Sequence, residues 1–172
     1  MADPANIPWL VGWGVAEPSG RDRRESERIV AYWEEKLQAL GGDFTLAALD
    51  LDQIDNRDWS SRFLVAVDPV IERSELILYG PEFARRLGLP AQPRTDRPLN
   101  RQLPPRYIEI FLQACAEATK QMAPLRREGE FERADGRLEQ YRAAFIPVRV
   151  KPNSLTALAL GAFSNRILDR SS

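Results

Sequence analysis

The sequence predicts an α+β fold, and three features of the chain carry this prediction. Two short apolar runs, residues 63–67 and 76–79, have the length and the β-branched or aromatic composition of buried strands. Residues 106–120 carry apolar side chains at the spacing of one helix face. Further along, the pair Asp135-Gly136 separates two strand-like segments, as the turn of a hairpin does.

The first two strands are followed by a short helix. Gly80 permits a sharp bend after the second strand, and Pro81 fits the first turn of a helix. That helix is predicted over residues 82–87, and Gly88 is placed to end it.

A longer helix is predicted near the N-terminus, over residues 22–40. Its apolar face, with a repeat of three or four residues, consists of Ile29, Val30, Trp33, Leu37 and Leu40. Such a face either lies across a sheet or pairs with its twin in a dimer. Ahead of it, residues 1–21 form an apolar arm, which either packs on its own domain or a neighbouring subunit, or docks a partner.

A loop is predicted over residues 91–105, because this stretch has four prolines and no apolar periodicity. The basic residues in it or next to it are Arg94, Arg97, Arg101 and Arg106. Asp96 is the only acidic residue that opposes them. The arginines form either a site for an anion or acidic partner, or a solvated loop, and the solvated loop is the preferred interpretation.

Three strands are predicted after the helix at 106–120, over residues 130–134, 137–150 and 155–163. Pro147 cannot donate a ladder hydrogen bond, so a bulge or a sheet edge is expected there. The last strand is apolar on both faces. Both faces of the sheet should therefore be covered, one by the helices and the other by the N-terminal helix or a second subunit.

This order of elements resembles a PAS domain. The segment ILYGPEFARRLGL, residues 77–89, is similar to the second-strand-to-helix segment of stand-alone bacterial PAS-like proteins. The resemblance implies an antiparallel five-stranded sheet with helices on one face, preceded by an N-terminal amphipathic helix. It divides the chain into the apolar arm (1–21), a helical extension (22–57), a PAS-like domain (58–165) and a polar tail (166–172).

The resemblance implies a non-catalytic sensory or regulatory module of bacterial signal transduction. It would bind a small ligand between sheet and helices, a protein partner, or both. The residues expected to line such a pocket, each of which also fits an ordinary core position, are Tyr79, Phe83, Tyr107, Phe111, Cys115 and Tyr141. The resemblance also implies a homodimer formed through the apolar face of the first helix. The alternative function is a ligand-free scaffold for dimerisation or docking.

The chain has no histidine, which excludes Ser/His and Cys/His nucleophile pairs and histidine-ligated zinc or haem. Cys115 lies in the context QACAE, which differs from the Asn-Cys-Arg-Phe-Leu-Gln motif of light-sensing flavin domains. Cysteinyl-flavin photochemistry is therefore not expected. Cys115 is instead expected to be a small buried thiol in the core. Because no nucleophile, acid and oxyanion set converges, neither catalytic residues nor a metal site are predicted, and the cofactor stays open.

The bulk composition excludes further partners. The net charge of the 172 residues is −1, so no basic field is available to hold nucleic acid. No apolar run reaches the length of a membrane span. A single cysteine and an N-terminus without a basic signal region predict a cytoplasmic protein.

Overall fold

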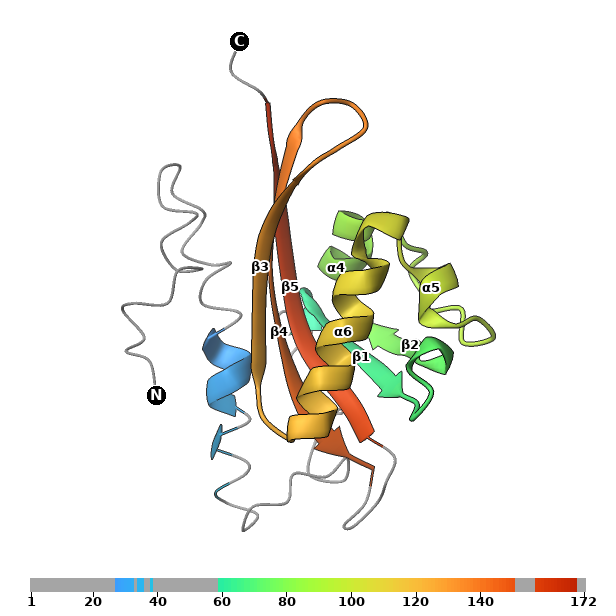
Figure 1. The fold of residues 1–172 in the computed structure, drawn as a ribbon, viewed down its shortest axis with the longest axis vertical. Helices are drawn as coiled ribbons and strands as arrows, with labels where there is room; N and C mark the ends of the chain where they lie inside the picture. Colours follow the sequence, from blue (N-terminus) through green and yellow to red (C-terminus); the bar gives the residue numbers. More distant parts are fainter. Residues whose placement is uncertain (1–26, 33, 36–37, 39–58, 151–156, 170–172) are drawn as a thin grey trace.

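The computed structural model describes residues 27–32, 34–35, 38, 59–150 and 157–169. The first three ranges are helical, and Figure 1 labels the later elements apart from one short 3-10 helix. They are β1 (Arg62–Val67), the 3-10 helix η4 (Ile71–Arg73), β2 (Glu75–Tyr79), α4 (Pro81–Leu87), α5 (Leu99–Gln102), α6 (Pro105–Gln121), β3 (Leu125–Glu132), β4 (Leu138–Arg149) and β5 (Ala157–Leu168).

All five strands form one antiparallel sheet in the order β2-β1-β5-β4-β3. The last strand of the chain therefore lies in the centre, paired with β1 on one side and β4 on the other. Helices α4, α5 and α6 lie on one side of this sheet (Figure 1). The predicted fold class, an α+β fold with a PAS-like five-stranded antiparallel sheet and helices on one face, is confirmed.

The long strands bury side chains on both faces. In β4, Phe145 belongs to the apolar cluster under the helices, and its neighbour Ile146 belongs to a second cluster on the opposite face. Ile29 and Val30 of the N-terminal helix are buried in this second cluster. Figure 1 shows that helix across the sheet from α6. Both faces are thus covered, as the two-sided apolar pattern predicts.

The residues predicted at a dimer interface divide into two groups. Ile29 and Val30 pack on the sheet of their own chain. Trp33, Leu37 and Leu40 lie outside the described residues, as does the arm at 1–21. Dimerisation through this helix therefore stays a prediction, and the described part of its apolar face is used within one chain.

Gly161 allows the neighbouring strands and the Phe63 ring to pack closely at the centre of the sheet. It pairs with Phe63 of β1 on one side and with Phe145 of β4 on the other. The ring centroids of these two phenylalanines lie 5.4 Å apart. A Cβ at position 161 would lie 2.1 Å from Phe63 Cζ and 2.5 Å from the carbonyl oxygen of Ala144. The position admits no side chain, because neighbouring strands occupy the space.

Three elements differ from their predicted bounds by more than a residue or two. β3 begins at Leu125, ahead of the predicted start at 130, because its pairing with β4 begins opposite Phe145. β5 continues past 163 to Leu168, paired with β4 as far as Leu138. The predicted loop at 91–105 contains the short helix α5, whose Leu99 is fully buried.

Pro147, which has no N–H to donate, lies where β4 is paired on one side only among the described strands. The pairing of β3 with β4 ends at Phe145, so β5 is the one neighbour of β4 at Pro147 among the described strands. There the register with β5 continues without a shift, and Pro147 lies opposite Ala159. Of the two predicted outcomes, a local edge is observed and not a bulge.

Candidate functional site

The six residues predicted to line a ligand pocket come together between the helices and the sheet. Tyr79 ends β2, Phe83 lies in α4, Tyr107, Phe111 and Cys115 lie in α6, and Tyr141 lies in β4. All six belong to the apolar cluster under the helices. Residues selected from four separate segments of the sequence therefore share one region of the fold.

In this cluster the aromatic rings pack directly against one another. The ring of Phe111 lies 5.4 Å from that of Phe145 and 5.9 Å from that of Phe163, measured between centroids. Tyr79 stacks on Phe83 at 5.5 Å. The members of the predicted set with no exposed surface are Phe83, Tyr107, Phe111 and Cys115. These four pack as core, and their contact with a ligand stays a prediction.

Cys115 faces the interior from α6. The thiol is free and fully buried. Burial raises the pKa of this thiol far above its ordinary range, because the thiolate would lose its hydration. It is therefore a protonated and unreactive side chain, in agreement with the interpretation from its sequence context.

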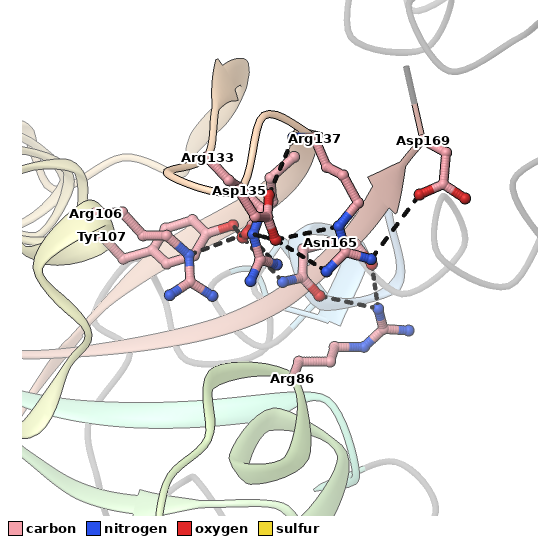
Figure 2. Close-up of polar contacts among 9 residues, drawn as sticks. Arg86, Arg106, Tyr107, Arg133, Asp135, Arg137, Asn165 and Asp169 are labelled. Atoms are coloured by element: carbon pink, nitrogen blue, oxygen red, sulfur yellow. Dashed lines mark hydrogen bonds and ion pairs between the residues drawn. The ribbon is translucent and has the colours of Figure 1, made fainter. Parts of the chain in front are cut away.

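A buried polar cluster, which we call the Glu139 cluster, lies at one end of this region (Figure 2). The side chain of Glu139 in β4 is 0% exposed. Its Oε2 accepts hydrogen bonds from the Tyr107 hydroxyl and from Nδ2 of Asn165, the latter at 3.1 Å. Its Oε1 accepts from Nε of Arg106 at 3.0 Å and from Nη1 of Arg133 at 3.4 Å. One carboxylate therefore joins α6, β5 and the end of the β3–β4 hairpin.

Arg86 extends the cluster to α4. Its Nη1 donates to the backbone carbonyl of Asn165 and, at 3.3 Å, to the side-chain Oδ1 of the same residue. Its Nε lies 3.3 Å from Oε1 of Glu82, one turn earlier in the helix. A buried carboxylate without partners is costly, so these contacts fix where α4 and α6 meet the sheet.

Nothing in the sequence pattern singled out Glu139, because it lies in the charged stretch that follows the hairpin turn. The signal that could have found it is the two-residue period of β4. Glu139 shares a face with Tyr141 and Phe145, and a carboxylate at the end of a buried face requires partners.

Burial also raises the pKa of the tyrosine hydroxyls in this region. For Tyr107 the hydrogen bond to Glu139 adds to the effect of burial, because a phenolate would face a carboxylate. For Tyr79 and Tyr141 burial is again the main cause of the raised pKa. Tyr107 is therefore a hydrogen-bond donor to Glu139 at all ordinary pH values.

We expect the free energy of unfolding to fall as the pH rises above about 10, the ordinary tyrosine pKa. In that range the unfolded chain loses protons that the folded chain keeps, so stability decreases with pH; below it the contribution of these tyrosines is fully present and does not change with pH. Denaturant unfolding at several pH values measures the slope, which should be shallower in Tyr107→Phe. An ordinary pKa for the phenolate absorbance that the folded wild-type protein shows and Tyr107→Phe lacks would contradict this prediction.

A second group of polar side chains lies beside the edge strand β2. A cavity of about 130 Å³ is lined by Tyr79, residues 88–90, Arg94, Arg97, Arg101 and Gln102. We call it the arginine cavity. The four arginines in or next to the predicted loop therefore divide: three line this cavity, and Arg106 joins the Glu139 cluster.

Gln102 holds the wall of the arginine cavity in place. Its Oε1 accepts from the Leu76 N–H at 2.7 Å, and its Nε2 donates to the Leu76 carbonyl at 3.0 Å. The amide thus pairs with an edge residue of β2 as a further strand would. Nε2 also donates to the Arg94 carbonyl at 2.9 Å, and the Tyr79 hydroxyl donates to the Pro90 carbonyl at 2.6 Å. The loop accordingly has a defined path.

Two other features are absent from the described part of the chain. There, no group of three or more Cys, Asp or Glu side chains is placed to hold a metal ion. No helix among the same residues is long and apolar enough to cross a membrane.

No protein-family model and no curated protein sequence matches the chain. Among solved structures, it is similar to a PAS domain from Colwellia psychrerythraea, with 15% identity, a TM-score of 0.44 and coverage of 64% of this chain and 92% of that one. It is also similar to a domain of an HTR-like protein from Haloarcula marismortui, with 20% identity, a TM-score of 0.44 and coverage of 62% and 98%.

A third similar structure is a fungal LOV domain photoreceptor, with 16% identity, a TM-score of 0.38 and coverage of 68% of this chain and 80% of that one. Two of these three structures are thus described as a PAS domain and a LOV domain. No ligand, chromophore or residue role is carried over from them to this chain.

Proposed function

We propose that this chain is a non-catalytic sensory or regulatory module of the PAS type, which acts in bacterial signal transduction by binding a small ligand, a protein partner, or both. The observation that carries the proposal is that two buried apolar clusters lie on opposite faces of the same strands. One holds the aromatic residues under α4 and α6, and the other holds Ile29 and Val30 of the N-terminal helix.

This arrangement suits the transmission of a change in packing. Neighbouring residues of β4, such as Phe145 and Ile146, belong to different clusters, so a displacement of the strand alters the packing on both faces. Interiors are close-packed and move between discrete arrangements instead of deforming smoothly. A ligand that changes how α6 lies on the sheet would therefore change the support of the N-terminal helix.

The burial of the polar groups favours a non-catalytic role. A catalytic acid or base must come within hydrogen-bond reach of its substrate. Glu139, the carboxylate with the most partners among the described residues, has no exposed surface, and neither has Tyr107. The free Cys115 supports a cytoplasmic location, where thiols stay reduced.

A second candidate function is a ligand-free scaffold for dimerisation or docking. It is favoured by the packing of the predicted pocket residues, because Phe83, Tyr107, Phe111 and Cys115 are fully buried against one another and their neighbours. In this case the aromatic cluster stabilises the domain, and the surface of the domain carries the function.

We expect the native mass spectrum of the freshly purified protein to show a species above the 19.5 kDa chain mass, and its absorption spectrum to show whether that species carries a chromophore. The same sample under denaturing conditions is the control, since a non-covalent ligand is then lost. A retained small molecule supports the sensor. A clean apo dimer supports the scaffold, and a clean apo monomer contradicts both the ligand and the homodimer.

A further inference from the structure

The arginine cavity concentrates positive charge without an acidic partner. Arg94, Arg97 and Arg101 line it, and the structure records no hydrogen bond or ion pair of their guanidinium groups with any described residue. Asp96 belongs to the same loop but does not line the cavity. All three are exposed residues, and like charges gathered around one cavity repel one another unless an anion lies between them.

The backbone of the loop holds these arginines close together despite the repulsion. The Arg97 N–H donates to the Arg94 carbonyl at 3.2 Å, and the Arg101 N–H donates to the Pro98 carbonyl at 2.8 Å. Gln102 then ties the Arg94 carbonyl to β2. Because the loop is tied at several points, its backbone is a preformed part of the cavity wall, from which the three exposed arginine side chains extend.

The volume of the cavity indicates the size of the anion that could neutralise the three arginines. Its volume of about 130 Å³ is several times the roughly 10–15 Å³ of cavity space that one water molecule needs. A group of four or five non-hydrogen atoms fits such a space. Guanidinium groups bind tetrahedral oxyanions in a bidentate manner, and phosphate offers enough oxygens for several arginines at once.

We propose that the arginine cavity binds a single phosphoryl group, supplied as free phosphate or as the terminal phosphate of a small monoester. Arg94, Arg97 and Arg101 donate to its oxygens, and Tyr79 and Gln102 form the wall that positions them. An acidic peptide fits this site less well. It would present one carboxylate at a time along an extended backbone, whereas the cavity is compact and lies beside a strand edge that Gln102 already pairs.

This site goes beyond the proposed function, because it lies outside the aromatic cluster and needs no ligand there. Tyr79 is the residue that the two share: its ring stacks on Phe83 in the core, and its hydroxyl bonds to Pro90 at the cavity. A phosphate group bound to the arginines would thus contact a residue that belongs to the core.

The test is calorimetric titration of the full chain with inorganic phosphate and, separately, with phenyl phosphate, at constant ionic strength set with chloride. We expect the wild-type protein to bind at least one of them. The triple variant Arg94→Gln, Arg97→Gln, Arg101→Gln should lose affinity by about tenfold or more, since hydrogen bonds to charged groups each carry that much. Equal affinity for the two ligands indicates free phosphate, and a preference for phenyl phosphate indicates a monoester.

Arg73→Gln is the matched control, because Arg73 is an exposed arginine of η4 that does not line the cavity. Its phosphate affinity should equal that of the wild type. The single variant Arg97→Gln tests the site should the triple variant fold poorly, and thermal unfolding verifies the fold of each. Absence of binding by the wild type, unchanged binding by the triple variant, an equal loss in Arg73→Gln, or tighter binding of an acidic peptide would each overturn the proposal.

Discussion

Replacing Glu139 with alanine is expected to lower the free energy of unfolding by about 3 kcal/mol, the lower end of the range for removing one partner of a buried ion pair. The lower end applies because the two arginines that contact the carboxylate, Arg106 and Arg133, are 32% and 25% exposed and can turn to water. The Tyr107 hydroxyl and the Asn165 amide have no such freedom, because their residues are buried. Each would be left with an unsatisfied donor.

Denaturant unfolding monitored by circular dichroism measures this loss, with the m-value as a test of two-state behaviour. The matched control is Glu130→Gln, which removes a carboxylate from an exposed position of β3 that contacts only Gln140 among the hydrogen bonds recorded here. It should change stability by less than about 0.5 kcal/mol. Glu139→Gln keeps the shape and one acceptor oxygen, so its effect should lie between the two. A Glu139→Ala variant as stable as the control would show that the cluster contributes nothing.

The fold could be predicted where local chemistry determines local structure. Gly80 and Pro81 mark the start of α4, and Gly88, with a φ of 66°, ends it in the left-handed conformation that glycine adopts without strain. The start of β3 could not be predicted this way, because Arg126, Arg127 and the residues after them give no apolar alternation. Those residues are a strand because β4 provides partners for their backbone, and this pairing is a tertiary effect.

The same distinction between local and tertiary effects decides which parts of the candidate site could be predicted. The aromatic residues were predictable because buried rings at helical or strand spacing converge on one core. The Glu139 cluster was not, because its hydrogen bonds join residues 32 and 26 positions apart in the chain. The arginine cavity is intermediate: the basic loop is visible in the sequence, but the tie from Gln102 to Leu76 that shapes the cavity wall spans 26 residues and leaves no local signal.

Replacing Phe111 with alanine is expected to have the other large effect, a loss of about 3–5 kcal/mol of stability. The ring has no exposed surface and lies within 5.1 Å of Phe63 and 5.4 Å of Phe145, centroid to centroid. Its removal would leave a cavity that α6 cannot fill without shifting against the sheet. Gln113→Ala, at an exposed position of the same helix, controls for changes in helix propensity and should cost less than about 0.5 kcal/mol.

Phe111→Trp distinguishes the two functional candidates, because a larger ring acts differently in a filled core and in an occupied pocket. If the cluster is only core, the variant loses about 1–3 kcal/mol through overpacking, and neither it nor the wild type shows a retained small molecule in the native mass spectrum. If a ligand lies against Phe111, the variant purifies without it, and the affinity of added ligand falls more than the stability does. A ligand retained unchanged by Phe111→Trp must bind elsewhere, and the six predicted residues would then be core residues whose packing holds α6 on the sheet.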